Sequence, residues 1–525
     1  PAGLKVHLSD LKENGMLIIN TANFTKKNID LAGYEGNPLE NDSLDGYQLI
    51  QVDMTQLVTT ALKELGLSSK LMSRSTNMFA LGLLYWLYGR SMDSSIDFIQ
   101  NKFATKPEIV DANIKALNTG YYYGETLEAI KTTYRVNKAT FEKGTYRNIM
   151  GNNALAFGLL AASQKSGLDL YYGGYPITPA SDILHYLAQY KHFGVKTFQA
   201  EDEIAGITSV IGAAFAGDLA VTATSGPGVA LKSEALGLAI ATELPLVLVN
   251  VQRGGPSTGL PTKTEQSDLN QAMFGRNGEA PMVILAPATP ADCFNMAYES
   301  CRIALKYMLP VILLSDGYIA NGSEPWKIPD VDSLPEIETQ VTTKKNGFVP
   351  FNHDNQHLAR PWGLPGTPGL EHRVGGLEKW DETGHVSYDP DNHHKMVELR
   401  QQKVDLIAND IPLSKIYGKG HGDLLVIGWG GTHGAIRSAV ESAQSDGLLV
   451  SHLHLRYLNP LPKDLGEILV KFQKVMIPEL NLGQLAMIIR SKFLVDAISL
   501  CKVQGKPFTQ NEVYHKIKEL IKEVK

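Results

Sequence analysis

Charged and hydroxyl side chains stand at several points where an apolar run of this sequence ends. Glu203 opens a run of small and apolar residues, Arg253 follows a strand-like run, and Thr178 lies in a proline-rich turn. A partly desolvated carboxylate suits proton transfer, an arginine can grip a carboxylate with two hydrogen bonds, and a hydroxyl near a helix start favours an anion. These residue types suit acid–base chemistry on an anionic ligand.

The first motif is YPITPAS, at 175–181. It lies where a predicted strand ends and a predicted helix begins, which is where open parallel sheets bind ligands. Two prolines restrict the turn, and the hydroxyls of Thr178 and Ser181 are expected to face the helix N-terminus, a position that favours a carboxylate. Alternatively, Ser181 only caps the helix.

Glu203 belongs to the motif QAEDEIAG, at 199–206, which places three carboxylates at a helix start. Two of the three suit surface capping charges. Glu203 directly precedes the run IAGITSVIGAAFAG, whose tight packing is expected to hold its carboxylate partly desolvated. The alternative is a surface charge that stabilises the helix dipole.

Two further turns follow predicted strands. TSGPG, at 224–228, offers the backbone N–H groups of a helix start to a flat ring or an anion. At 249–269 the run VNVQRGGPSTGLPTKTEQSDL leaves a strand and enters a long loop with Arg253 at its root. An arginine there suits a bidentate contact with a carboxylate, or else a surface ion pair.

An alternation of strand-like and helix-like runs positions these turns. Residue periodicity and Gly or Pro punctuation predict the elements between 149 and 325. Predicted helices cover 154–167, 180–190, 203–217 and 230–243, and predicted strands cover 168–176, 196–199, 219–225, 244–251 and 310–316. Such alternation predicts a doubly wound parallel sheet.

The chain of 525 residues is long enough for about three domains. We expect three α/β units, at 1–138, 149–325 and 421–525. The stretch 326–420 is turn-rich and polar and carries six histidines, so it is expected to form a long excursion that packs against its neighbours.

The first unit begins with strand and helix alternation. Strands are predicted at 16–20 and 47–55, a helix at 55–66, an apolar run at 78–88, and a helix-like run at 93–117 that is followed by the cluster GYYYGE. The third unit repeats the pattern, with strands predicted at 424–430, 450–458 and 474–480 and helices at 434–447 and 465–472.

Composition excludes several classes of protein. A net charge of −6 gives no electrostatic footprint for nucleic acid or an anionic membrane. The apolar run at 78–88 is shorter than the roughly 20 residues that cross a bilayer, so no membrane span is expected. The three cysteines form no CxxC pair and favour a reducing cytoplasm. We expect no signal peptide, and the start at Pro1 suggests that upstream residues are missing.

Taken together and in this order, the four motifs resemble the α subunit of 2-oxoacid:ferredoxin oxidoreductases, most closely the 2-oxoglutarate branch. The resemblance covers the whole chain. The region 149–325 resembles the thiamine-pyrimidine-binding domain of that family, and ELNLGQL, at 479–485, resembles its transketolase-C-terminal-like domain. The region 1–138 resembles the Rossmann-like γ subunit, here fused ahead of α, although the Gly-rich turn that opens it is absent.

The resemblance implies a role for each site residue. Glu203 would hydrogen-bond N1′ of the thiamine aminopyrimidine and promote the imino tautomer that deprotonates the thiazolium carbon. Thr178 and Arg253 would hold the carboxylate of the 2-oxoacid. Lys263 would reach the distal carboxylate of a dicarboxylic substrate, or else is a solvated loop charge. The pyrimidine pocket would be lined by Tyr175, Pro176, Ile177, Ser225 and Gly226.

A missing motif implies a partner. Thiamine diphosphate enzymes hold the diphosphate through magnesium with a GDG motif, which this sequence lacks, and SDGYIAN at 315–321 has the wrong first residue. Magnesium, the diphosphate site and a [4Fe-4S] cluster are therefore expected from a β subunit, in an αβ or (αβ)2 assembly. The implied reaction converts 2-oxoglutarate and coenzyme A into succinyl-CoA and carbon dioxide while ferredoxin is reduced, or runs in reverse.

Alternatives to this interpretation stay open. A pyruvate or branched-chain 2-oxoacid enzyme is the alternative within the family, and a non-catalytic α/β scaffold is the alternative outside it. GWGGTHG, at 428–434, imitates a dinucleotide-binding turn but has a displaced last glycine, so we expect close packing there rather than NAD binding. The histidines of 326–420 match no common metal-ligand spacing.

Overall fold

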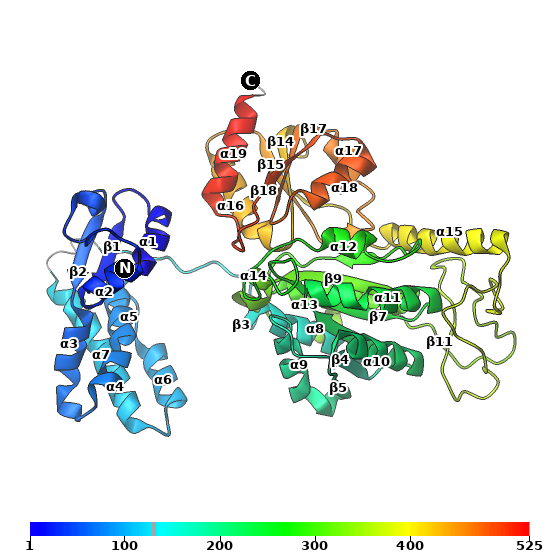
Figure 1. Ribbon diagram of the computed structural model, residues 1–525, viewed down its shortest axis with the longest axis horizontal. Coiled ribbons are helices and arrows are strands. Elements are labelled where there is room, and N and C mark those ends of the chain that lie inside the picture. Colours follow the sequence, from blue (N-terminus) through cyan, green and yellow to red (C-terminus); the bar gives the residue numbers. More distant parts are fainter. Residues whose placement is uncertain (128–132, 524–525) are drawn as a thin grey trace. The chain divides into compact units, whose positions relative to one another are not determined.

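The chain folds into two compact units in the computed structural model, which describes residues 1–127 and 133–523. The units are Pro1–Glu142 and Lys143–Lys525. Figure 1 draws the first in blue and cyan and the second from cyan through red. The second unit contains all four motifs that carry candidate chemistry.

The first unit combines a small parallel sheet with a bundle of helices. Its two-stranded sheet pairs β1 with β2 in parallel, from Met16 opposite Gln48 to Asn20 opposite Val52. The predicted helix-like run at 93–117 forms two helices, because the helical conformation is interrupted ahead of Pro107. The cluster GYYYGE lies inside the second of these helices. The α-helices and strands are α1(Ala2–His7), β1(Met16–Asn20), α2(Lys26–Leu31), β2(Gln48–Val52), α3(Met54–Leu62), α4(Ser69–Arg74), α5(Thr76–Leu87), α6(Asp93–Lys102) and α7(Pro107–Thr126).

Glycines let α5 and α7 approach backbone to backbone. A methyl group added to Gly82 would lie 1.9 Å from the carbonyl oxygen of Leu117, and one added to Gly120 would lie 1.9 Å from that of Phe79. No side chain fits at either position, so the apolar run at 78–88 forms a helix that packs one face closely against α7, while Leu84 and Tyr88 stay exposed.

A seven-stranded sheet forms the first half of the second unit. Its strand order is β16-β8-β9-β7-β6-β4-β5, and every pairing is parallel except that of β16 with β8. The α-helices and strands are β3(Tyr146–Met150), α8(Gly151–Ser166), β4(Leu170–Gly174), α9(Ser181–Leu187), β5(Val195–Gln199), α10(Glu203–Ala216), β6(Leu219–Thr224), α11(Gly226–Thr242), β7(Leu246–Gln252), α12(Leu269–Phe274), β8(Val283–Leu285), α13(Asp292–Tyr307), β9(Pro310–Asp316), α14(Gly317–Asn321) and β10(Ser323–Lys327). The expected doubly wound sheet is thus present.

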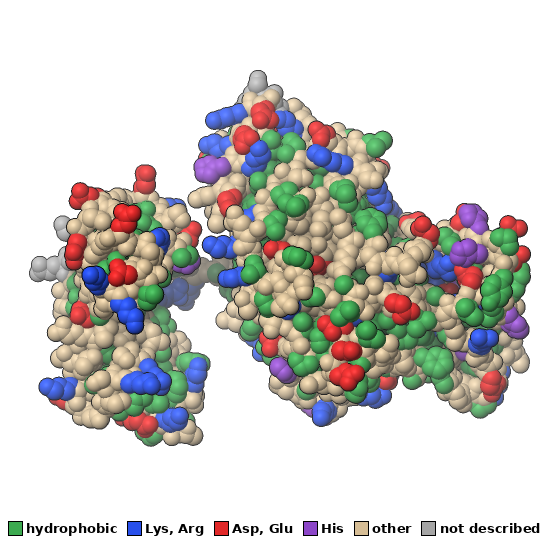
Figure 2. All heavy atoms as spheres, in the orientation of Figure 1, with side chains coloured by type: hydrophobic (Ala, Val, Ile, Leu, Met, Phe, Trp, Pro, Cys, Tyr) green, Lys and Arg blue, Asp and Glu red, His purple; other side chains and the backbone are tan. Residues whose placement is uncertain are grey.

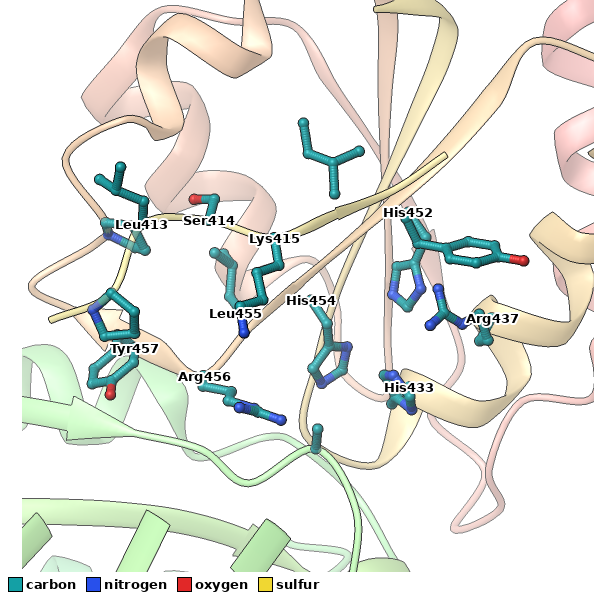
Figure 3. A pocket seen from close by; sticks show the side chains of 15 residues that line it. Leu413, Ser414, Lys415, His433, Arg437, His452, His454, Leu455, Arg456 and Tyr457 are labelled. Atoms are coloured by element: carbon teal, nitrogen blue, oxygen red, sulfur yellow. The ribbon is translucent and has the colours of Figure 1, made fainter. Parts of the chain in front are cut away.

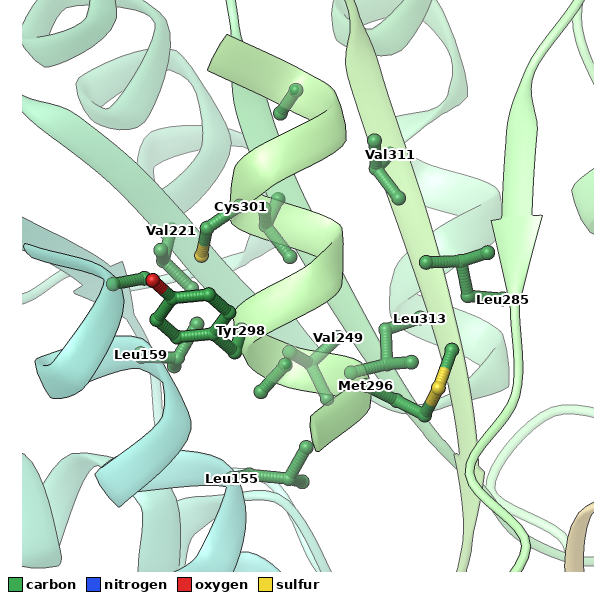
Figure 4. Close-up of a cluster of buried hydrophobic side chains, with 14 of the residues drawn as sticks. Leu155, Leu159, Val221, Val249, Leu285, Met296, Tyr298, Cys301, Val311 and Leu313 are labelled. Atoms are coloured by element: carbon green, nitrogen blue, oxygen red, sulfur yellow. The ribbon is translucent and has the colours of Figure 1, made fainter. Parts of the chain in front are cut away.

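Alternating strand residues build a separate core on each face of this sheet. On β7, Val247 and Val249 face α8 and α13, whereas Leu246 and Leu248 face α10 and α11. Figure 4 shows the first of these cores, with Cys301 of α13 among strand side chains. Helices cover both faces of the sheet, as is usual for parallel strands, which are buried on both sides.

The rest of the second unit holds a smaller sheet, in the order β13-β15-β14-β17-β18. Helices α16 and α19 cover one face, and α17 and α18 pack on the other, in a core that is continuous with the one around α10 and α11. The α-helices and strands are β11(Val341–Thr342), β12(Trp362–Gly363), α15(Pro390–Leu406), β13(Ile416–Tyr417), β14(Gly422–Trp429), α16(His433–Ser445), β15(Val450–Leu455), β16(Tyr457–Asn459), α17(Leu465–Leu469), β17(Phe472–Glu479), α18(Gln484–Phe493), β18(Ala497–Cys501) and α19(Gln510–Lys522).

Polar contacts connect the two sheets. The buried carboxylate of Asp316, at the end of β9, accepts the N–H of Gly431 at 2.8 Å, and burial raises its pKa. A methyl group on Gly431 would lie 2.7 Å from that carboxylate. Three glycines of GWGGTHG, Gly428, Gly430 and Gly431, therefore serve close packing, and part of that packing is against the end of β9, whereas a methyl group on Gly434 would meet no atom within 4 Å.

The excursion at 326–420 contains a helix that we did not predict. Helix α15 spans Pro390–Leu406, and Asp389 caps it by accepting the N–H of Asn392 at 2.8 Å. An aspartate followed by a proline is a helix-start signal. The helix escapes a periodicity search because its exposed surface is polar and its apolar stripe is weak.

Buried charges hold the excursion against the end of α11. Glu243 accepts from the ammonium group of Lys403 and lies 2.9 Å from Nε2 of His353, and all three side chains are at most 5% exposed. Lys379 donates to the carbonyl oxygen of Ala241 at 2.5 Å. Burial alone would raise the pKa of Glu243, but Lys403 and His353 hold it below its ordinary value.

No helix among residues 1–127 and 133–523 is both long and apolar enough to span a bilayer. On the face drawn in Figure 2, acidic and basic side chains are interspersed.

Replacing Glu243 with Gln is expected to destabilise the second unit by about 3–5 kcal/mol, because it leaves the ammonium group of Lys403 buried without a carboxylate. Urea unfolding at pH 7 measures the change. The exposed Glu338→Gln variant is the matched control and should unfold like the wild type.

The same network sets a pH dependence. Because the pKa of Glu243 is lowered in the folded state, its contribution is present above about pH 4.3 and is lost as the pH falls. The gap between wild type and Glu243→Gln should therefore narrow in acid. A gap that stays constant from pH 7 to pH 3 would contradict this origin of the stability.

Candidate active site

The candidate site lies at the carboxyl edge of the seven-stranded sheet. From β4 the chain moves to β5 on one side and then to β6 on the other, so the strand order reverses beside β4. Ligands of open α/β sheets bind in the crevice at such a switch point. Tyr175 follows β4, Ser225 follows β6 and Arg253 follows β7, and Glu203 begins the helix after β5.

A hydrogen bond bridges the switch point. The hydroxyl of Tyr175 lies 2.8 Å from Oγ1 of Thr224, and both side chains are buried. Burial raises the pKa of Tyr175, and the neighbouring Glu203 carboxylate raises it further, so the hydroxyl keeps its proton. A methyl group on Gly228 would lie 2.4 Å from the Tyr175 hydroxyl and 3.1 Å from Cγ of Glu203. The four residues therefore form one tightly packed cluster.

The first turn of α10 orients Glu203. Asp202 caps the helix by accepting the N–H of Ala205 at 2.8 Å, which confirms a capping role for one of the three acidic residues. Glu203 is the first helical residue and is half-buried. The first turn of α10 therefore fixes the backbone from which the Glu203 side chain extends, and the side chain remains partly exposed.

Lys232, in α11, contacts this turn through the backbone of Glu203. It was not among the predicted site residues. Its fully buried ammonium group donates to the carbonyl oxygen of Glu203 at 2.5 Å and lies 5.2 Å from the centre of the Tyr175 ring. Burial lowers the pKa of Lys232 to about 8, whereas Glu203 and Asp202 act to raise it. A lysine on the buried face of the predicted helix at 230–243 was the signal that could have revealed it.

Arg253 and Thr178 meet at the turn after β4. Nη1 of Arg253 donates to the backbone carbonyl oxygen of Thr178 at 2.6 Å, and the arginine is only 6% exposed. Its Nε has no hydrogen-bond partner among the described residues. Thr178 is exposed and lines a cavity of 250 Å³ together with Asp182 and Thr262.

The turn after β6 carries Ser225 and Gly226. The buried Oγ of Ser225 has no hydrogen-bond partner in the described part of the chain. A methyl group on Gly226 would lie 2.8 Å from a carboxylate oxygen of Asp268, a residue that we did not single out. Burial raises the pKa of Asp268 to about 6, although the side-chain hydrogen bond from Asn250 lowers it.

The remaining predicted residues lie in the turn after β4 and in the loop after β7. Pro176 is exposed and Ile177 is half-buried in the same turn. Ser181 does not cap α9, because its hydroxyl accepts the N–H of Ile177 at 2.8 Å and so closes the turn itself. Lys263 is exposed, and its Cβ would lie 2.7 Å from a methyl group on Gly505.

The donor set matches one end of thiamine diphosphate. A half-buried carboxylate, an apolar wall and the unpartnered hydroxyl of Ser225 suit an aminopyrimidine ring, which has both donors and acceptors on its edge. The described residues of the candidate site offer no comparable set of groups for the diphosphate end. Among the described residues no group of three or more His, Cys, Asp or Glu side chains is placed to hold a metal ion.

Two family models match the chain. Residues 163–389 match the model described as pyruvate flavodoxin/ferredoxin oxidoreductase, thiamine diphosphate-binding, and residues 1–123 match that of pyruvate ferredoxin/flavodoxin oxidoreductase. The first match spans the candidate site. The second falls in the unit that resembles a fused γ domain.

Curated relatives match over nearly the whole chain. The 2-oxoglutarate oxidoreductase subunit KorA of Mycobacterium tuberculosis is 54% identical over 98% of this chain and 78% of its own length. The α subunit of 2-oxoacid:ferredoxin oxidoreductase 1 from Aeropyrum pernix is 31% identical over 90% of this chain and 75% of its own.

A solved structure agrees with these relatives. It is the 2-oxoglutarate:ferredoxin oxidoreductase of Magnetococcus marinus with 2-oxoglutarate, coenzyme A and succinyl-CoA bound. The match has a TM-score of 0.87 and 32% identity, and it covers 99% of this chain and 87% of that chain. The resemblance predicted from the four motifs is confirmed, and the chain belongs to the 2-oxoacid:ferredoxin oxidoreductase family, in its KorA-type 2-oxoglutarate oxidoreductase branch.

Proposed function

We propose that this chain is the pyrimidine-binding subunit of a thiamine diphosphate-dependent 2-oxoglutarate:ferredoxin oxidoreductase. The observation that carries the proposal is the cluster of Glu203, Tyr175 and Thr224 at the switch point of a sheet whose family model is thiamine diphosphate-binding. The reaction converts 2-oxoglutarate and coenzyme A into succinyl-CoA and carbon dioxide and reduces ferredoxin, or runs in reverse.

Glu203 exchanges a proton with the cofactor in this proposal. When bound, thiamine diphosphate supplies a nucleophilic carbon and an electron sink for decarboxylation. The Glu203 carboxyl group would share a proton with the ring nitrogen N1′ of the bound pyrimidine, and Tyr175 and Gly228 pack so closely beside it that the side chain has little freedom. Lys232 orients the helix turn through the Glu203 carbonyl. Ser225, Gly226, Pro176 and Ile177 would line the ring.

Arg253 and Thr178 position the substrate. Arg253 is buried, permanently charged and held by the Thr178 carbonyl, so its unpartnered Nε–H and the exposed hydroxyl of Thr178 would together bind the carboxylate of the 2-oxoacid. Burial strengthens such a contact because water does not screen it. This grip serves any 2-oxoacid, since every member of the class carries that carboxylate.

Selection of 2-oxoglutarate requires a second positive charge. Lys263 lies in the loop that follows Arg253 and is exposed, so it is free to reach the distal carboxylate. The names of the relatives, which include 2-oxoglutarate synthase subunits, favour this substrate over pyruvate. Branched-chain 2-oxoacids lack the distal carboxylate and would gain nothing from Lys263.

The other half of the active site belongs to a partner. A β subunit with a GDG motif would hold magnesium, the diphosphate and a [4Fe-4S] cluster, because this sequence has no GDG and the described residues offer no metal site. We propose an αβ or (αβ)2 assembly in the cytoplasm, where the free thiols of Cys293 and Cys301 stay reduced. A scaffold without chemistry would not need a buried arginine with an unpartnered Nε.

The chain and its partner subunit, purified together, are expected to reduce methyl viologen with 2-oxoglutarate and coenzyme A at least tenfold faster than with pyruvate. The measurement is the initial rate under anaerobic conditions for each substrate. Equal or faster turnover of pyruvate would reject the substrate assignment. No turnover of any 2-oxoacid would favour the scaffold alternative.

The Glu203→Gln variant is expected to lose at least a hundredfold in turnover, because an amide cannot exchange the proton that activates the pyrimidine. Calorimetry with thiamine diphosphate gives a second readout, and we expect affinity to fall no more than about tenfold. Glu201→Gln, two residues earlier and exposed, is the matched control. Turnover unchanged in Glu203→Gln would remove this residue from the chemistry.

Arg253→Gln and Lys263→Gln should separate the two carboxylate contacts. Loss of Arg253 removes a charge-assisted contact and should raise KM about 10- to 100-fold for both 2-oxoglutarate and pyruvate. Loss of Lys263 should raise KM for 2-oxoglutarate alone. Steady-state kinetics with both substrates checks this, and an equal effect of Lys263→Gln on both would make it a solvated loop charge.

A further inference from the structure

A second cavity lies in the smaller sheet, away from the pyrimidine site. It has a volume of 350 Å³ and shares no lining residue with the candidate active site. The loop at 412–417, the first turns of α16 and the strand β15 surround it. Figure 3 shows three histidines, His433, His452 and His454, gathered on one side of this space.

The histidines form a compact group of ring donors and acceptors. Their ring centroids are 4.8 to 5.7 Å apart. His452 is only 3% exposed, yet its Nε2 has no hydrogen-bond partner among the described residues. An unpartnered polar atom of that kind is costly unless a ligand or water satisfies it.

Cations complete the same wall. Arg437, one turn into α16, lies with its guanidinium carbon 3.4 Å from the centre of the Tyr417 ring, which holds it flat beside the cavity. Lys415 and Arg456 also line the space, and carboxylates partly neutralise both arginines: Asp292 lies 3.0 Å from Nε of Arg456, and Glu441 lies 3.5 Å from Nε of Arg437. The wall therefore has an excess of positive charge.

The remaining lining is apolar. Pro412, Leu413, Ile416 and Pro462 also border the cavity. A ligand that fills it therefore contacts both cationic and apolar side chains, so it needs an anionic group and a less polar body. Planar arginine donors and imidazole N–H groups together suit the several acceptor oxygens of a phosphate.

We propose that this cavity is a binding site for a small phosphate monoester, and it shares no lining residue with the cavity beside Thr178. Arg437 and His452 contact the phosphate, and the apolar residues of the 412–417 loop contact the body of the ester. Burial lowers the pKa of His452 to about 3, so it enters the site as a neutral imidazole that offers a single N–H.

Titration of the full chain by isothermal calorimetry tests the proposal, with inorganic phosphate, adenosine monophosphate and succinate as probes. Inorganic phosphate is expected to bind, and the monophosphate is expected to bind at least tenfold more tightly because it also covers the apolar wall. Succinate, a dianion without phosphate, should bind at least tenfold more weakly than inorganic phosphate. Absence of phosphate binding, or equal binding of succinate, would overturn the proposal.

Variants locate the binding. Arg437→Gln and His452→Gln should each weaken the affinity for inorganic phosphate at least tenfold, whereas the exposed Arg373→Gln should leave it unchanged. Circular dichroism and the thermal midpoint establish that each variant is folded, and the wild-type titration tests the proposal even where a variant is not. Competition by coenzyme A, or full affinity in Arg437→Gln, would overturn a separate site in this cavity.

Discussion

Parallel strands of an open sheet all end at the same edge, and the chain can reach both sides of β4 only by reversing direction there. This constraint places Tyr175 and Thr224 on adjacent strand ends and brings the start of α10 beside them. The hydrogen bond between the hydroxyls of Tyr175 and Thr224 then holds the two strand ends together at the crevice. Glu203 and Arg253 have a common site only because their strands end at that edge.

The cluster at the switch point depends on residues that do no chemistry of their own. Lys232 reaches from α11 to the first turn of α10, and Gly228 leaves just enough room for the Tyr175 hydroxyl and Glu203. Both features restrict the carboxylate before any ligand binds. Preorganisation of this kind places a reacting group without an entropy cost at the moment of reaction.

Buried polar contacts also define how the second unit is assembled. Asp316 links the end of β9 to Gly431, and Glu243 links the end of α11 to the excursion. Each carboxylate is buried and is satisfied by groups far away in the sequence. Such contacts favour one packing arrangement of these segments, because a displaced segment would leave a buried carboxylate without its hydrogen-bonding partner.

The sequence by itself predicted the strand and helix alternation around the site and the chemistry of the family, but not α13, α18 or α19. Periodicity predicted the alternation from α8 to β7, since the spacing of apolar residues is a local property. The four motifs predicted the family that the relatives confirm. The same search missed α15, whose polar surface hides its period, and broke down at 93–117, where Pro107 starts a new helix.

Only the tertiary structure decided which side chains meet. Lys232 and Glu203 are 29 residues apart, Asp316 and Gly431 are 115 apart, and Glu243 and Lys403 are 160 apart. No local pattern reports such distances, because they depend on strand order and on the packing of helices over the sheet. For the same reason the sequence did not predict that Asp268 lies beside Gly226 or that three histidines line one cavity.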